Sequence, residues 1–171
     1  VGFTPEVLTD ATADMAFSLL LDIARRTTEG DKIIRDGKWR EIYGAFDYVG
    51  VDLQGKTIGI LGLGRIGSTL AKRAKAFDMK IIYHNRKHVA KSKEKSLDAK
   101  YVSFEKLITE SDFLSIHVPH TKETDRLFNM KIFKKMKKTS FLINTSRGKV
   151  VNEKDLAIAL KKRIIAGAGL E

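Results

Sequence analysis

The stretch Thr57-Ile-Gly-Ile-Leu61, followed at once by Gly62-Leu-Gly-Arg-Ile-Gly67, decides the fold of this chain. An apolar run of this kind is typical of a buried strand, and the residues from Ser68 to Phe77 have the composition of a helix. A G-x-G-x-x-G turn between a strand and a helix predicts a dinucleotide-binding site. The alternative is a tight strand-to-helix turn that binds no ligand.

Each glycine of the turn has its own predicted role. Gly62 permits the tight turn, Gly64 lets the backbone approach a pyrophosphate, and Gly67 lets the helix pack closely on the strand. The start of the helix offers free N–H groups and the positive end of its dipole, and both favour a phosphate.

The next predicted strand ends in basic residues. It covers Lys80–His84, about twenty residues after the turn, where an acidic residue normally binds the ribose 2′-OH. Here Asn85, Arg86 and Lys87 follow, without an acid. A carboxylate would repel a 2′-phosphate, whereas two cations attract one. We therefore predict NADP(H) as the cofactor, with NAD(H) as the alternative.

The composition predicts a single globular domain. The chain has 171 residues, of which 43% are hydrophobic and 31% charged, and it contains no cysteine. Disulfides, thiolate catalysis and cysteine metal sites are therefore excluded. No apolar run is long enough to span a membrane and no signal-peptide pattern opens the chain, so we expect a cytoplasmic protein without a membrane partner.

A net charge of +11 raises the alternative of a polyanion-binding protein. The lysines, however, fall where solvated helix faces and loops are expected, and no zinc-finger spacing or RNA-binding motif accompanies them. We therefore expect no nucleic-acid partner. The lysine-rich stretch 87–100 is predicted to be a mobile loop.

Strands and helices alternate along the chain from Thr57 onward. Apolar strands separated by helices predict an α/β fold with a doubly wound parallel sheet of the Rossmann type. The expected strands are 57–61, 80–84, 113–118, 140–144 and 164–168, and the expected helices are 65–77, 104–109, 129–137 and 153–161. Asn152 is expected to cap the last helix, with Asp155 completing a capping box.

An apolar helix is expected to precede this sheet at Ala11–Arg26, capped by Thr9 or Asp10. Apolar residues cover so much of this helix that it should be buried on several sides, in part by a partner subunit. A polar stretch with Gly30, Gly37, Gly44 and Gly50 follows it.

Arg147 stands directly after an apolar strand, in Thr145-Ser-Arg-Gly148. Its planar guanidinium suits a carboxylate, which it can bind through two parallel hydrogen bonds. A surface salt bridge or a helix-capping role is an equally open alternative from position alone. His117 and His120 are candidate proton donors, but neither has an acidic partner at a recognisable spacing, and no metal-ligand spacing is found.

Several motifs in one collinear order resemble the D-isomer-specific 2-hydroxyacid dehydrogenases. The motifs are Val7-Leu-Thr-Asp-Ala-Thr-Ala-Asp14, Gly37-Lys-Trp39, Leu53-Gln-Gly-Lys-Thr57, the glycine turn, Val118-Pro-His-Thr-Lys-Glu-Thr124, Asn144-Thr-Ser-Arg-Gly148 and Ile165-Ala-Gly-Ala-Gly-Leu170. The resemblance implies that Arg147 is the catalytic arginine that binds the substrate carboxylate. It also implies a set of cofactor-binding residues: Thr12, Gly62, Gly64, Arg65, Ile66, Gly67, Asn85, Arg86, Lys87, Val118, Pro119, Thr124, Thr145, Ser146, Arg147 and Glu171. Glu171 stands where the family usually has Asp.

The resemblance implies that residues 1–171 are the dinucleotide-binding domain of a longer two-domain enzyme. Its substrate domain and its proton-donating histidine would lie outside this chain, so we expect the chain alone to bind dinucleotide without turnover. The whole enzyme would be a homodimer that transfers a hydride between NADPH and a 2-oxo acid, as glyoxylate and hydroxypyruvate reductases do. The alternative is a non-enzymatic dinucleotide sensor that resembles the co-repressors of this superfamily.

Overall fold

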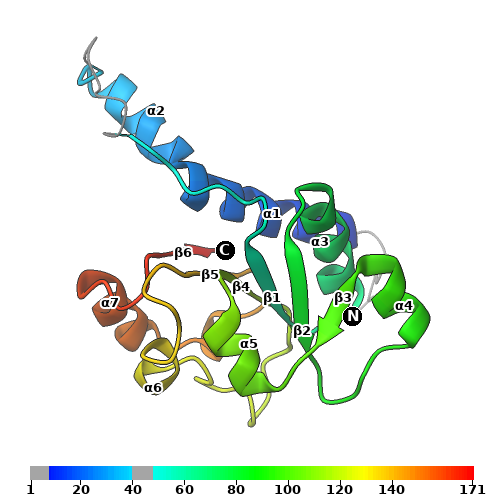
Figure 1. The fold of residues 1–171 in the computed structure, drawn as a ribbon. Coiled ribbons are helices and arrows are strands. Elements are labelled where there is room, and N and C mark those ends of the chain that lie inside the picture. The colour runs from blue at the N-terminus through cyan, green and yellow to red at the C-terminus, as the bar shows by residue number, and fades with distance from the viewer. Residues whose placement is uncertain (1–7, 40–47) are drawn as a thin grey trace.

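A computed structural model describes residues 8–39 and 48–171, and its centre is a six-stranded parallel sheet. The strands lie in the order β3-β2-β1-β4-β5-β6 (Figure 1). Their bounds are β1 Thr57–Leu61, β2 Lys80–His84, β3 Ala99–Tyr101, β4 Phe113–Ile116, β5 Phe141–Asn144 and β6 Gly167–Leu170. This is the order of a doubly wound dinucleotide-binding sheet, so the predicted fold is confirmed.

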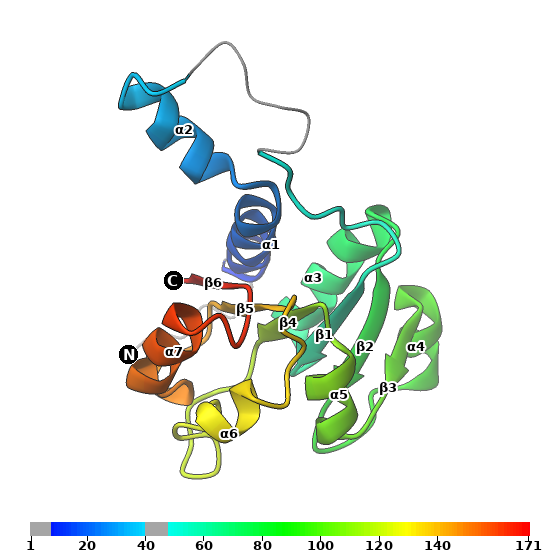
Figure 2. The ribbon, with the colours of Figure 1, turned by 60° about the vertical axis from the view of Figure 1, so that its left-hand side comes forward.

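Helices cover both faces of the sheet (Figure 2). One hydrophobic core lies beneath α1 and α3, and a second lies beneath α5, α6 and α7. The helices are α1 Thr9–Arg25, α2 Thr27–Arg35, α3 Arg65–Ala76, α4 Lys91–Leu97, α5 Phe104–Glu110, α6 Met130–Phe133 and α7 Glu153–Lys161, with a 3₁₀ turn η1 at Gly148–Val150. Burial on both faces explains why the central strands are apolar throughout.

Helix α1 packs one face on the domain, whereas burial on several sides was expected. Its buried residues are Ala13, Ala16, Phe17, Leu20 and Ala24. Met15 on another face is 42% exposed, so the described residues do not cover the helix on every side. The predicted cap is wrong, because α1 begins at Thr9 and Leu8 occupies the N-cap position.

Helix α2 leads away from the sheet in a segment that was predicted only as a polar stretch (Figure 1). Arg26 joins it to α1 in a left-handed conformation, with φ of 58°. Ion pairs one turn apart, Arg26–Glu29 and Asp31–Arg35, support this helix. Helix α2 was not predicted from the sequence because it contains Gly30 and lacks an apolar stripe. Gly44 lies outside the described residues, as does Val7 of the first motif.

Stretch 87–100 is not the predicted mobile loop, because it forms α4 and leads into β3. The Tyr83 hydroxyl donates to the Glu94 carboxylate at 2.6 Å and ties α4 to β2. A short lysine-rich helix with one fully buried residue, Leu97, offers no periodic apolar pattern, and a three-residue strand with a central lysine offers no clear alternation.

The last two elements differ from the predicted boundaries. β6 begins at Gly167 rather than Ile164, because Ile165 packs in the second core before the strand starts. Asn152 caps α7 as predicted, since its side chain accepts a hydrogen bond from the Asp155 N–H. The Asp155 carboxylate does not complete a capping box. It accepts from the Met130 N–H at 2.8 Å and so links α7 to α6.

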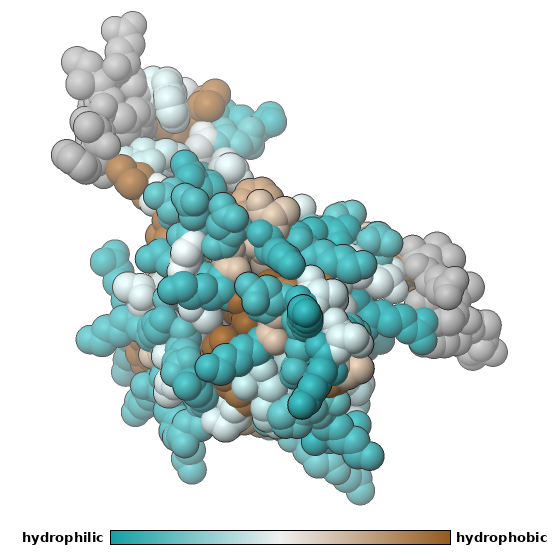
Figure 3. Space-filling model, turned by 45° about the vertical axis from the view of Figure 1, so that its right-hand side comes forward, coloured by the Kyte–Doolittle hydropathy of each residue, from teal (hydrophilic) through white to brown (hydrophobic). Residues whose placement is uncertain are grey.

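Hydrophilic side chains cover most of the face in Figure 3, which fits lysines placed on solvated helix surfaces. Among the described residues, no helix has the length and apolar character needed to cross a membrane.

Candidate active site

The cleft that contains Arg147 lies beside the point in the sheet where the strand order reverses. From β1 the chain builds β2 and β3 on one side, then returns to place β4 and β5 on the other. Ligands of such sheets bind at the carboxyl ends of the strands, at this switch point. A cleft of 850 Å³ is found there, lined by Leu8, Thr9, Thr12, Ile66, His117, Val118, Pro119, His120, Thr145, Ser146, Arg147, Gly148 and Lys149.

The structure brings seven predicted site residues together in this cleft: Thr12, Ile66, Val118, Pro119, Thr145, Ser146 and Arg147. They come from α1, α3 and the loops after β4 and β5. Four lining residues were not proposed from the sequence, namely Leu8, Thr9, Gly148 and Lys149. Each of the four is a neighbour of a predicted site residue or motif, and that adjacency is the sequence signal that could have found them.

The three glycines of the turn differ in what surrounds them. Gly62 has φ of 99°, and a Cβ there would lie 2.7 Å from the His117 carbonyl oxygen. A Cβ on Gly67 would lie 2.3 Å from the Gly62 carbonyl oxygen. At Gly64, by contrast, a Cβ would meet no atom of the described residues within 4 Å, its two chain neighbours aside. The fold itself requires glycine at 62 and 67, whereas at Gly64 the missing side chain leaves open space for a ligand.

Asn85 connects the segment after β2 to the glycine turn. Its amide oxygen accepts a hydrogen bond from the Leu63 N–H at 2.7 Å. Arg86 and Lys87, which follow it, are exposed. Asn85 therefore has a positioning role that sequence analysis missed, because no sequence pattern shows that residues 22 positions apart are bonded.

Arg147 is held by its own loop. Its Nη1 donates to the Ser146 carbonyl oxygen at 2.7 Å, and no ion pair with a carboxylate is found for it among the described residues. The structure therefore does not support the salt-bridge alternative, and Arg147 can direct its remaining N–H groups at a ligand. It is exposed at the edge of the cleft.

Asn144 at the end of β5 shapes the Arg147 loop and was not singled out as a site residue. It is 3% exposed, and its amide donates to the Arg147 carbonyl oxygen at 3.1 Å. Its own oxygen accepts from the Ser146 N–H and the Ser146 hydroxyl, at 3.0 and 2.7 Å. A buried polar residue at the carboxyl end of an apolar strand is the sequence signal for such a role.

Thr145 carries a buried hydroxyl without a hydrogen-bond partner among the described residues. Burying an unpaired hydroxyl costs about 1–3 kcal/mol, so such groups occur mainly where a ligand or water completes them. Thr145 lines the cleft beside Arg147. Its orphaned oxygen and the open space at Gly64 both fit a polar ligand such as a dinucleotide.

The two candidate histidines differ in environment. Burial lowers the pKa of His117 to about 4, and its Nε2 lies 2.8 Å from the Ser115 hydroxyl oxygen, so the imidazole is neutral at pH 7. His120 at the cleft edge pairs with Asp125 at 2.7 Å. The prediction that His120 has no acidic partner is therefore wrong. The five-residue separation was not recognised because a turn, rather than a helix, brings the pair together.

Nine predicted cofactor-binding residues do not line the cleft: Gly62, Gly64, Arg65, Gly67, Asn85, Arg86, Lys87, Thr124 and Glu171. The last two have structural contacts of their own. The Thr124 hydroxyl donates to the Pro119 carbonyl oxygen and accepts from the Thr121 N–H, both at 2.7 Å, so it stabilises the loop. Glu171 is exposed after β6, and its N–H donates to the Asn144 carbonyl oxygen at 3.1 Å.

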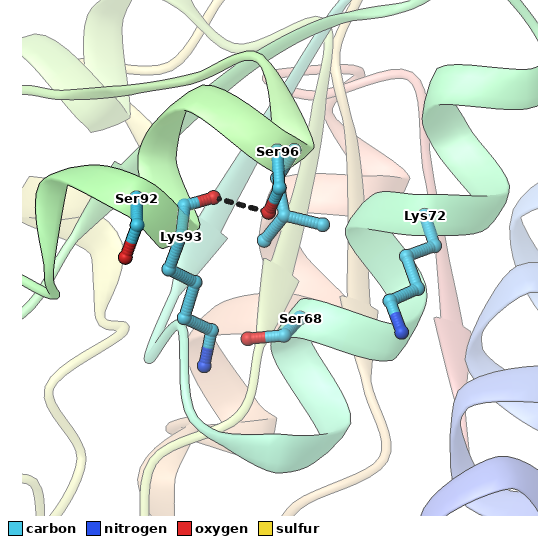
Figure 4. A pocket seen from close by; sticks show the side chains of 6 residues that line it. Ser68, Lys72, Ser92, Lys93 and Ser96 are labelled. Carbon is cyan, nitrogen blue, oxygen red and sulfur yellow. Dashed lines mark hydrogen bonds between the residues drawn. The ribbon is translucent and has the colours of Figure 1, made fainter.

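A second hollow, between α3 and α4, is lined mainly by hydroxyls and lysines, including Lys72 and Lys93 (Figure 4). The Ser68 hydroxyl donates to the Gly64 carbonyl oxygen at 2.5 Å, and the Ser96 hydroxyl donates to the Lys93 carbonyl oxygen at 2.9 Å. Both hydroxyl protons are thus committed within their helices, so this hollow offers an anion fewer donors than its composition suggests.

Comparison with known proteins assigns the chain to a family. The model of the NAD binding domain of D-isomer specific 2-hydroxyacid dehydrogenases matches residues 17–171. The glyoxylate reductase of Thermococcus litoralis is 53% identical over 98% of this chain and 51% of its own length, and that of Pyrococcus horikoshii is 50% identical over the same shares. The chain thus spans about half the length of the curated relatives it matches.

Solved structures agree with this assignment. The TT0316 protein from Thermus thermophilus superimposes with a TM-score of 0.91 at 43% identity, over 98% of this chain and 51% of that chain. A glyoxylate reductase from Paecilomyes thermophila superimposes with a TM-score of 0.89 at 39% identity, over 98% and 49% of the two chains.

Proposed function

This chain belongs to the D-isomer specific 2-hydroxyacid dehydrogenases, and we propose that residues 1–171 are the dinucleotide-binding domain of a reductase. The whole enzyme would interconvert a small 2-oxo acid and the corresponding D-2-hydroxy acid, with glyoxylate and hydroxypyruvate as candidate substrates. The observation that carries the proposal is that Arg147 and Thr145 line the same cleft. Among the described residues, Arg147 has no carboxylate partner and the buried Thr145 hydroxyl has no hydrogen-bond partner.

Arg147 is proposed as the catalytic residue that binds the substrate carboxylate. Its guanidinium can hold both carboxylate oxygens in a fixed plane and so orient the neighbouring keto carbon. The Asn144 side-chain amide holds the backbone of this loop through its hydrogen bond to the Arg147 carbonyl oxygen. Binding at a loop that the sheet holds rigidly fixes the substrate with little loss of entropy at the moment of reaction.

A nicotinamide dinucleotide, when bound, supplies the hydride for this reaction. The open space at Gly64 and the N–H groups at the start of α3 would hold its pyrophosphate, together with Arg65 and Ile66. Thr12, Val118, Pro119, Thr145 and Ser146 line the cleft toward Arg147 and would contact its nicotinamide end. The family resemblance also implies cofactor contacts for Thr124 and Glu171, and these contacts stay predictions.

NADP(H) is the proposed cofactor. Asn85 is neutral, and Arg86 and Lys87 are exposed cations directly after it. An acidic residue at the end of β2, which would repel a 2′-phosphate, is absent. The proton for the reduced oxygen is not assigned to His117, because an imidazole with a pKa near 4 is uncharged at neutral pH and its remaining N–H is too weak an acid to act as the donor.

A homodimer is proposed on the features of α1 and α2. Met15 on α1 is 42% exposed, Ile34 on α2 is 58% exposed, and α2 leads away from the sheet (Figure 1). Apolar side chains on a projecting helix are suited to a partner subunit. Sedimentation of the chain should show a dimer that Met15→Lys weakens. A cytoplasmic location stays a prediction from the sequence.

Calorimetric titration of the chain with NADPH and with NADH at matched low salt tests the cofactor assignment. We expect tighter NADPH binding, and loss of that preference in the Arg86→Ala/Lys87→Ala double variant. Equal affinities in the unsubstituted chain would contradict the assignment of NADP(H).

The role of Arg147 is tested separately. In the whole enzyme, Arg147→Ala should lower kcat/KM by about a hundredfold or more, because the substrate is no longer oriented. The same change in the 171-residue chain should leave NADPH affinity within about twofold, since one peripheral contact contributes little. Normal turnover by the whole-enzyme variant would contradict the role assigned to Arg147.

A further inference from the structure

We propose that Tyr101, on the edge strand β3, is a specificity-determining positioning residue that holds the Asn85–Lys87 segment ready for a 2′-phosphate. This inference rests on the proposed assignment of NADP(H). Tyr101 lies in the strand that sequence analysis missed, directly after the stretch 87–100 that was expected to be mobile.

The first contact fixes the start of the segment. The Tyr101 hydroxyl donates to the Asn85 carbonyl oxygen at 3.3 Å. The Asn85 side chain accepts from the Leu63 N–H at 2.7 Å. Asn85 is therefore held through its backbone by β3 and through its side chain by the glycine turn.

The second contact fixes the far end of the segment. The His88 ring stacks on the Tyr101 ring, with centroids 3.6 Å apart and planes 26° apart. The next residue, Val89, donates its N–H to the Tyr83 hydroxyl at 3.1 Å, and that hydroxyl donates to Glu94. The Tyr83 and Tyr101 rings pack edge to face at 5.4 Å, so the two tyrosines form one support.

Arg86 and Lys87 lie between these two fixed points and are exposed. No ion pair is found for either residue in the described parts of the chain. The charge of Arg86 acts on the Glu123 carboxylate, where it contributes to a lowered pKa, although hydrogen bonds at Glu123 contribute more. Two cations carried by a loop that is fixed at both ends lose less conformational freedom when an anion binds.

This arrangement should affect the two nicotinamide cofactors differently. A 2′-phosphate would engage Arg86 and Lys87, whereas a 2′-hydroxyl offers them no charge to bind. Releasing the segment from Tyr101 should therefore weaken NADPH binding and leave NADH binding nearly unchanged. A purely structural tyrosine would instead lower stability and weaken both cofactors alike.

Two variants of the chain separate the contacts. Tyr101→Phe removes the hydrogen bond to Asn85 and keeps the stacked ring, and Tyr101→Leu removes both. Phe104→Leu is the matched control, because the Phe104 ring packs on His84 and Phe128 next to β3 and, among the described residues, on no ring of residues 85–90. Affinities for NADPH and NADH are measured by calorimetry, and Tm by thermal unfolding.

We expect Tyr101→Phe to weaken NADPH binding by about two- to tenfold, the effect of one hydrogen bond, and to change NADH binding less than twofold. Tyr101→Leu should weaken NADPH binding further, and Phe104→Leu should leave the ratio of the two affinities unchanged despite a lower Tm. Parallel weakening of both cofactors, or an unchanged ratio in both tyrosine variants, would overturn the proposal.

The Arg86→Ala/Lys87→Ala variant distinguishes the failure of this inference from that of the proposed function. If that variant loses NADPH preference while the Tyr101 variants retain it, only the role of Tyr101 is wrong. If the unsubstituted chain has no NADPH preference, the cofactor assignment on which the inference rests is wrong.

Discussion

The side-chain oxygen of Asn85 accepts a hydrogen bond from the Leu63 N–H at 2.7 Å, which joins the end of β2 to the glycine turn after β1. An aspartate at position 85 can accept the same hydrogen bond but adds a negative charge. Asn85→Asp should therefore keep the fold and weaken NADPH binding by about tenfold through repulsion of the 2′-phosphate. It should also strengthen NADH binding through the ribose 2′-OH.

Calorimetry with both cofactors checks this prediction, and Asn85→Leu is the control. The leucine variant loses the bond to Leu63, so its Tm should fall and both affinities should weaken together. An aspartate variant that still prefers NADPH would show that the charge at position 85 does not select the cofactor.

Gly64 and Gly67 should respond in opposite ways to a single added methyl group. Gly67→Ala would place a Cβ 2.3 Å from the Gly62 carbonyl oxygen, so the unfolding free energy should fall by about 1–3 kcal/mol or more. The added Cβ of Gly64→Ala meets no atom within 4 Å in the described parts of the chain beyond its two neighbours, so stability should change by about 1 kcal/mol or less. Its dinucleotide affinity should nevertheless fall by at least about tenfold, because the methyl group occupies ligand space. Urea unfolding and calorimetry on both variants provide the test, and full affinity in Gly64→Ala would contradict the pyrophosphate assignment.

Asn144 should contribute to the free energy of unfolding, although it is not one of the residues predicted to bind a ligand. Asn144→Ala removes hydrogen bonds to Arg147 and Ser146 inside the protein, which should cost about 1–3 kcal/mol of unfolding free energy. Ser146→Ala, which removes a single hydroxyl contact, should cost less and is the matched control. Hydrogen exchange at the Ser146 amide should speed up in Asn144→Ala. Unchanged exchange would mean that the loop holds its shape without Asn144.

His117 should make the stability of the chain depend on pH in a defined window. Burial lowers its pKa from 6.5 to about 4, so between these values the unfolded chain binds a proton that the folded chain does not. The stabilising contribution is complete above pH 6.5 and is lost as the pH falls toward 4. Its size is at most about 3 kcal/mol.

Urea unfolding of the chain and of His117→Gln at several pH values between 4 and 7 isolates this contribution. The variant should lose less stability than the unsubstituted chain as the pH falls through the window. Curves that stay parallel would mean that the imidazole takes up its proton without cost in the folded state.

The sheet, the glycine turn and the Arg147 loop were predictable because each depends on a local pattern. Alternating apolar strands and helices, with one strand–turn–helix motif, suffice to predict a doubly wound parallel sheet with a dinucleotide turn after β1. Relationships across the sheet were not predictable. The bonds of Asn85 to Leu63 and of Tyr101 to Asn85 join segments whose spacing has no helical or strand period.

Elements with weak local preference were also missed. Helix α4 is held by the contacts of Tyr83 with Glu94 and Val89, and strand β3 by its parallel pairing with β2, rather than by an apolar stripe of their own. The predicted bounds of β6 were wrong because Gly167 and Gly169 lack the bulky side chains by which strands are recognised in a sequence. In each case tertiary packing, rather than intrinsic propensity, decides the local structure.

The strand order has a practical consequence for enzyme engineering. Asn85–Lys87 follow β2 and Arg147 follows β5, so the two loops lie on opposite sides of β1 in the sheet. In the proposed reductase, substitutions that change the cofactor preference can therefore be screened on one loop while the other is left as it is. Libraries at the two loops should combine with nearly additive effects, which would let cofactor choice and substrate range be optimised in parallel.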